Sequence, residues 1–135
     1  NDDVLQGLRN IRRHLSPGAL FLCDFWYGPS VLYDRPTDRV RVLRTPRGEV
    51  VRTTQTTLDI VQHTAEVVFR LLSLEDKRVV SDTQETHRTR YFFPQEFALF
   101  LSQSGFEMLG ISAFPTIDAP LTDATWNAFV VARAI

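Results

Sequence analysis

The chain has 135 residues, a length that fits one domain with a buried core. Its net charge of −1 argues against a broad electrostatic surface for nucleic acid or for an anionic membrane, and no apolar stretch reaches the roughly 20 residues of a membrane span. The single cysteine, Cys23, excludes an internal disulfide and a cysteine-based metal site, and we expect a reducing, cytoplasmic environment.

The first residues predict a helix. Asp2 and Asp3 lie where they can cap free N–H groups, and Arg12, Arg13 and His14 lie at the opposite end. This basic cluster either complements the helix dipole, which we favour, or binds an anion. The apolar residues between follow the spacing of one helix face: Val4, Leu5, Leu8, Ile11 and Leu15.

An apolar run from Ala19 to Trp26 follows a Ser-Pro-Gly turn. The run does not alternate between polar and apolar residues, which is typical of a parallel strand covered on both faces. Leu20 and Leu22 are therefore expected to lie deep and to matter for packing. The order helix, turn, strand indicates half of a crossover unit in an α/β protein.

The residues from Arg39 to Phe93 favour β structure, because Val, Thr and Phe are frequent there, together with Arg, and helical spacing is almost absent. TPRGE at 45–49 is a turn signal, and positions 65–71 alternate as in a half-buried strand. Val79 to Tyr91 is predicted as a strand that is polar on both faces, as at a sheet edge or beside a wet cavity. We expect three or four antiparallel strands, inserted into the α/β frame.

The last third returns to the α/β pattern. Pro94 begins a predicted helix whose apolar stripe is formed by Phe97, Phe100 and Leu101. Phe106 to Phe114 is predicted as a strand, and Trp126 to Ala132 is apolar on both faces, as in a central strand.

Three segments, in this order, carry a resemblance to a known family: LRNIRRHLSPGALFLCDFW, RYFFPQEFALFLSQSGFEMLGI and WNAFVVARA. They resemble the helix and fifth strand, the later helix and sixth strand, and the closing seventh strand of class I S-adenosylmethionine-dependent methyltransferases. The resemblance implies an α/β fold class, the C-terminal part of a Rossmann-like methyltransferase fold with strands five to seven in a mixed sheet. It divides a single partial domain, 1–135, into a frame at 1–30 and 94–135 and an antiparallel β meander at 31–93. The meander resembles the lid of some small-molecule methyltransferases.

The cofactor signature of that family is absent from the chain. The family has a Gly-rich turn after its first strand and an acid at the end of its second, whereas this sequence has no GxGxG and its six glycines are scattered. The resemblance begins after the fourth strand. It therefore implies that S-adenosylmethionine is bound mainly by an N-terminal half outside this chain, either cut away or a separate polypeptide. The chain alone is expected to be inactive, and no metal is expected.

The candidate substrate-binding residues end the first predicted strand. In open α/β sheets, ligands lie beyond the carboxyl ends of the strands, so Asp24, Phe25, Trp26 and Tyr27 are expected to face the methyl-transfer cleft. An acid beside aromatic rings suits an amine-bearing substrate. Each aromatic residue either contacts the substrate or packs in the core. Asp24 is the stronger candidate, because an acid at the end of a buried strand needs a partner.

The remaining candidates lie further along the chain. Tyr27 and His87 are weak candidates for catalysis, and His63 is a third, although a histidine on an amphipathic strand is more often a surface residue. Arg90, with Arg88 on the same strand face, either holds an anionic group of the substrate or lies on a solvated face.

Two hypotheses of function follow. The first is the substrate-binding portion of a small-molecule methyltransferase, for which the sequence does not specify whether nitrogen, oxygen or carbon is methylated. The alternative is a non-catalytic, β-rich binding or dimerisation module that the frame only supports. Under either hypothesis the β insert or an exposed sheet edge could form a homo-oligomer, and neither nucleic acid nor a membrane is an expected partner.

Overall fold

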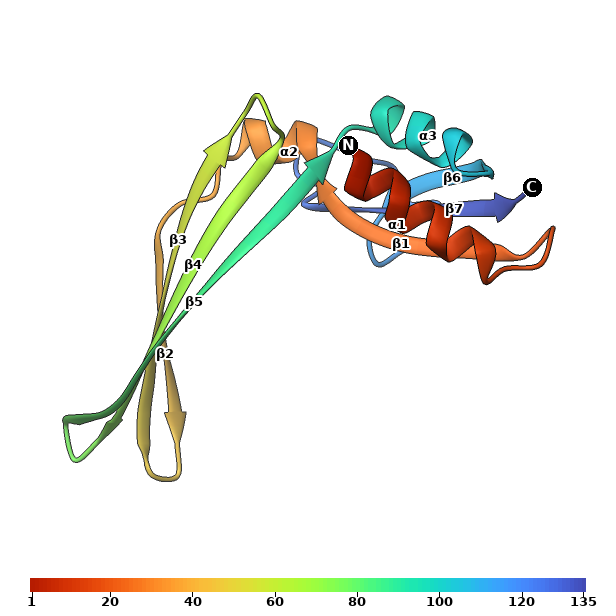
Figure 1. Ribbon diagram of the computed structural model, residues 1–135. Helices are drawn as coiled ribbons and strands as arrows, with labels where there is room; N and C mark the ends of the chain where they lie inside the picture. Colours follow the sequence, from red (N-terminus) through yellow and green to blue (C-terminus); the bar gives the residue numbers. More distant parts are fainter. The chain divides into compact units, whose positions relative to one another are not determined.

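The computed structural model describes residues 1–135, which form three helices and seven strands (Figure 1). In chain order these are α1 (Asp2–Arg13), β1 (Leu20–Tyr27), α2 (Gly28–Tyr33), β2 (Arg39–Thr45), β3 (Gly48–Asp59), β4 (Thr64–Glu75), β5 (Arg78–Phe92), α3 (Pro94–Gln103), β6 (Phe106–Ala113) and β7 (Asn127–Ala134). The hydrogen-bonded strand order is β2-β3-β4-β5-β1-β7-β6. None of the helices is long and apolar enough to cross a membrane.

The chain divides into two compact units. The frame unit comprises Asn1–Asp34 and Tyr91–Ile135, and the β unit comprises Arg35–Arg90. Strand β5 begins in the β unit and ends in the frame unit. Each unit is described by itself below.

The frame unit contains the mixed sheet that the sequence predicts. Strand β7 pairs antiparallel with β1 on one side and with β6 on the other. The last residues of β5 pair in parallel with the end of β1, Tyr91 opposite Trp26 and Phe92 opposite Tyr27. The mixed sheet that the resemblance implies is confirmed: the strand from Ala19 runs antiparallel to the strand from Trp126, and the three predicted frame strands share one sheet.

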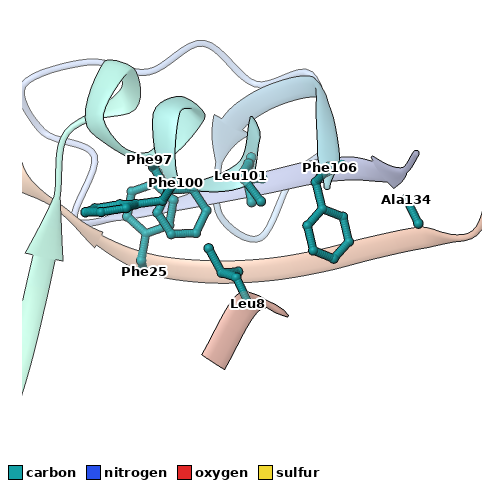
Figure 2. Close-up of a cluster of buried hydrophobic side chains, with 10 residues drawn as sticks. Leu8, Phe25, Phe97, Phe100, Leu101, Phe106 and Ala134 are labelled. Carbon is teal, nitrogen blue, oxygen red and sulfur yellow. The ribbon is translucent and has the colours of Figure 1, made fainter. Parts of the chain in front are cut away.

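Helices α1 and α3 cover one face of this sheet. Figure 2 shows Leu8 of α1 and Phe97 of α3 directed at the side chains of the strands. Phe25 and Phe97 pack with their ring centroids 4.6 Å apart. The predicted stripe of α3 is confirmed as core, since all three of its residues are buried. The buried cluster consists of Leu8, Phe25, Phe97, Phe100, Leu101, Phe106, Ala128, Val130, Ala132 and Ala134.

The prediction that β1 is covered on both faces is wrong. Leu20 is 54% exposed and Leu22 is 49% exposed, whereas Phe25 on the other face is buried. The reason is the period of two along a strand: odd-numbered residues of β1 face α1 and α3, whereas Leu20, Leu22 and Asp24 on the other face are exposed. Leu20 and Leu22 therefore do not pack in the core of this chain.

The basic end of α1 has a structural role that sequence reasoning did not foresee. The guanidinium of Arg12 donates hydrogen bonds to the carbonyl oxygens of Leu15 (2.8 Å), Gly105 (3.2 Å) and Ile135 (2.6 Å). These bonds join the end of α1 to the turn after α3 and to the end of the chain after β7. Arg12 is thus used within the fold, which argues against the alternative of an anion site at this helix end.

The segment after β1 forms a short helix, α2, where the sequence indicated only a Gly-Pro turn. A Cβ atom on Gly28 would lie 2.8 Å from the ring of Phe93 and 3.0 Å from the carbonyl oxygen of Phe92, so the close approach of the two segments favours glycine. The hydroxyl of Ser30 donates to the carbonyl oxygens of Thr122 (3.2 Å) and Asp123 (2.7 Å). These bonds fix the loop before β7 beside the end of β1.

The β unit is a four-stranded antiparallel meander, β2 to β5, as predicted. The turn at TPRGE joins β2 to β3, with Thr45 opposite Gly48. A register shift interrupts the β4–β5 ladder at Ser73 and Leu74. Only Ala65 and Val67 are buried in this unit, and β5 is exposed over most of its length although it pairs with β4.

Candidate substrate-binding site

The acid of β1 has a defined partner on the neighbouring strand. Asp24 lies opposite Phe129 in the β1–β7 ladder, and Trp26 lies opposite Asn127. The Nδ2 amide of Asn127 donates a hydrogen bond of 2.9 Å to Oδ2 of Asp24. One carboxylate oxygen is thus held in place, and the amide does not neutralise the negative charge.

Aromatic residues neighbour this acid in the sheet: Phe129 lies opposite it, and Trp26 lies two residues along β1 on the same face. The rings of Trp26 and Trp126 lie 5.3 Å apart, and those of Phe114 and Phe129 lie 6.3 Å apart. All four belong to the end of β1, to the start of β7 or to the loop that joins β6 to β7. An accessible carboxylate among aromatic rings is suited to a cation such as a protonated amine, because the charge pairs with the acid and the rings attract it through their faces.

The structure separates the four candidates of β1 into two pairs. Asp24 and Trp26 lie on the face opposite to the one that α1 and α3 cover, but Phe25 is buried among Phe92 and Phe97. Tyr27 packs against the same core, and its backbone N–H donates to the carbonyl oxygen of Trp126 at 2.9 Å. The expectation that four consecutive side chains face one cleft is corrected here, because the strand continues through Tyr27 and its side chains alternate.

Cys23, beside this acid, lies on the core-facing side of β1. Burial, and secondarily the charge of Asp24, raises the pKa of its thiol to about 11. The group therefore stays a neutral thiol near pH 7 and packs as a small apolar side chain.

The other candidates lie in the β unit or at its end. Nε2 of His87 lies 3.3 Å from the carboxylate of Glu85, and its ring packs 5.5 Å from that of Phe69. His63 occupies the turn between β3 and β4 with a positive φ of 52°. Arg90 is the last residue of the β unit and lies opposite Thr64. No group of three or more His, Cys, Asp or Glu side chains gathers anywhere in residues 1–135.

Sequence reasoning missed Asn127, Trp126 and Phe129 as neighbours of Asp24. They stand in a segment that the sequence marks only as an apolar central strand. The register between β1 and β7 could have identified them. An antiparallel pairing that buries Ala128 and Val130 places the alternate residues of β7, Asn127 and Phe129, on the same face as Asp24.

No model of a known protein family matches this sequence, and no curated protein is similar enough to match. Solved structures do match. An S-adenosylmethionine-dependent methyltransferase from Clostridium acetobutylicum ATCC 824 is similar over 98% of this chain and 51% of its own, with a TM-score of 0.78 and 12% identity.

Two further structures are similar in the same way. The CcbJ methyltransferase from Streptomyces caelestis covers 96% of this chain with 49% of its own, at a TM-score of 0.73 and 18% identity. The sugar N-methyltransferase KedS8 from Streptoalloteichus sp ATCC 53650 covers 96% with 48% of its own, at a TM-score of 0.70 and 16% identity. The chain thus spans about half the length of the structures it matches. It has the Rossmann-like fold of S-adenosylmethionine-dependent methyltransferases over that length, consistent with their C-terminal half.

Proposed function

We propose that this chain is the substrate-binding C-terminal portion of an S-adenosylmethionine-dependent methyltransferase that acts on a small molecule. The observation that carries the proposal is the fold, which is shared with such enzymes over nearly the whole chain. The neighbour KedS8 is a sugar N-methyltransferase, and a small-molecule substrate is consistent with that likeness.

The site at the end of β1 supports an amine as the group that is bound. Asp24 keeps one oxygen on Asn127 and has a second oxygen to accept a bond from a substrate ammonium. Trp26 and Trp126 supply an apolar wall beside it. Methyl transfer is an in-line displacement, so the contribution of these residues is to hold and orient the nucleophile and to limit water.

The residues present do not fit S-adenosylmethionine by themselves. The glycines with positive φ in this chain, Gly18, Gly48 and Gly105, stand singly in three separate turns and form no Gly-rich loop between a strand and a helix. The cofactor supplies the reactive methyl group. Its binding is assigned to a half outside this chain, and Asp24 and its neighbours are assigned to the substrate.

Isothermal titration of the 135-residue chain with S-adenosylmethionine tests this division. No saturable heat is expected from the chain alone. Saturable binding in the micromolar range typical of substrates would show that these residues hold the cofactor themselves, and the assignment of this chain to the substrate would then be wrong.

A second candidate function, a non-catalytic binding or dimerisation module, is favoured by one observation. The β unit exposes large apolar side chains on its strands, among them Val40, Val42 and Val79. A full-length protein that contains no cofactor-binding half would favour this alternative.

A further inference from the structure

Basic residues are concentrated in the β unit. They outnumber acidic residues between Arg35 and Arg90, while acidic residues outnumber basic ones in the frame unit. Within the β2–β3 ladder, Arg41 lies directly opposite Arg52, so the two side chains share one face of the sheet. Like charges at directly opposite positions destabilise a sheet, so this pair needs a compensating interaction.

The charges of this pair are not compensated by acids in the ladder. Arg39 lies two residues along β2 on the same face, which adds a third positive charge, and the partner of Arg52 on β4 is Leu71. The opposite face differs. There Arg44 lies opposite Glu49, and Arg70 forms an ion pair with Asp82 at 2.6 Å.

Arg52 also has an unused donor. Its Nε atom is buried and has no hydrogen-bond partner, and its guanidinium carbon lies 5.8 Å from the centre of the Phe69 ring. The ring attracts the charge through its face but does not supply an oxygen acceptor for Nε–H. A buried N–H without an acceptor is unfavourable, so the site lacks a group that accepts hydrogen bonds and carries negative charge.

We propose that Arg41 and Arg52, with Arg39 beside them, form a binding site for a phosphate group, free or as a phosphate ester. A guanidinium presents a planar fork of donors that matches phosphate oxygens, and a doubly charged phosphate neutralises the opposed pair. Inorganic phosphate would also bridge the two side chains and supply the acceptor for Nε of Arg52. The site lies within the β unit and does not involve Asp24, so it stands independently of the proposed amine site.

The test is a titration of the 15N-labelled chain with inorganic phosphate and, separately, with glycerol phosphate, following the Nε–H signal of Arg52 by NMR. A saturable shift is expected with the wild type for both probes. Arg41→Gln is expected to weaken the apparent affinity at least tenfold. The matched control, Arg44→Gln, removes the same charge from the same strand on the other face and is expected to change the affinity less than twofold.

Thermal stability gives a second test, because Arg41→Gln should weaken phosphate binding and yet raise Tm when phosphate is absent. In phosphate-free buffer, Arg41→Gln is expected to raise Tm, because it removes the repulsion from Arg52, and to abolish the rise in Tm that phosphate gives the wild type. Arg52→Lys keeps the charge but loses the fork, so weaker phosphate binding is expected there too. The absence of a saturable shift in the wild type, or equal weakening by Arg44→Gln, would overturn the proposal.

Discussion

The frame unit and the β unit bury apolar side chains to very different extents. In the frame unit, two helices cover one sheet face and enclose a continuous cluster that includes Leu101 and Phe106. In the β unit, Val40, Val42 and Val79 are each more than half exposed. A sheet gains independent stability by packing one face on another layer. We infer that the free energy of unfolding resides mainly in the frame unit, and that the surfaces of the β unit are suited to binding.

Truncation of a leucine in the frame unit gives the largest expected effect. Leu101 is completely buried, so Leu101→Ala is expected to lower the free energy of unfolding by about 2–5 kcal/mol. The control is Leu22→Ala on the uncovered face of β1, with an expected loss below about 1 kcal/mol because the side chain is half exposed. Urea denaturation measures both. Equal losses at a concentration where the chain is monomeric would mean that the face of Leu22 is covered within the chain itself.

The next effect tests the proposed methyl-transfer activity, measured on a longer protein that contains this chain. Asp24→Asn keeps an oxygen that accepts from Asn127 but removes the charge that would pair with an amine. We expect kcat/KM to fall at least about tenfold, a loss of ~1.4 kcal/mol in transition-state binding, with Tm nearly unchanged. Glu107→Gln is the matched control, since it removes an exposed acid of β6 that lies 3.5 Å from Arg133. A variant that unfolds while its folded fraction stays fully active would make Asp24 a structural acid.

A smaller effect is expected on association. Leu20 and Leu22 form an exposed apolar patch on β1, and β5 pairs only with the last two residues of that strand. Exposed apolar surface beside an unpaired edge favours contact between copies. Light scattering is therefore expected to show self-association of the 135-residue chain, reduced by Leu22→Lys. Leu99→Lys, on the exposed side of α3, serves as the control. A monomer at every concentration would contradict the expectation.

Periodicity in the sequence was sufficient to predict most of the fold. The stripe of α3 and the turn between β2 and β3 were predicted and are confirmed. These features depend on local patterns: apolar spacing, Gly and Pro positions, and the order of elements. The resemblance of three segments to methyltransferases is also confirmed at the level of fold.

The site was harder to predict because it depends on the register between paired strands and on which face of the sheet each side chain occupies. A run such as LFLCDFWY is apolar at nearly every position, so the sequence does not show that Leu22 is exposed and Phe25 buried. The pairing of Asp24 with Asn127 joins residues more than a hundred positions apart, and the opposed Arg41 and Arg52 depend on which residues of two strands meet. Information of this kind arises only when strands pair.

The smallest expected effect concerns the ion pair between Arg70 and Asp82, which contrasts with the unpaired charges of Arg41 and Arg52 in the same unit. Arg70 donates to both carboxylate oxygens of Asp82, at 2.9 and 2.6 Å, and these hydrogen bonds lower the pKa of Asp82. Since the folded-state pKa lies below the unfolded one, the stabilisation by this pair is fully present above the unfolded-state pKa. It is lost as the pH falls through the folded-state value.

Arg70→Gln is expected to return the pKa of Asp82 toward its ordinary value in an NMR titration of the carboxyl carbon. The change in stability near pH 7 should be slight, because both side chains are exposed and screened by salt. Arg41→Gln is the control, since Arg41 lies on the other face of the sheet and should leave the Asp82 titration unchanged. If Arg41→Gln shifts the pKa of Asp82 as much as Arg70→Gln does, that pKa depends on long-range interactions with all charges of the β unit and not on the direct ion pair. The two faces would then not be electrostatically distinct, and the separation of compensated from uncompensated arginines would fail.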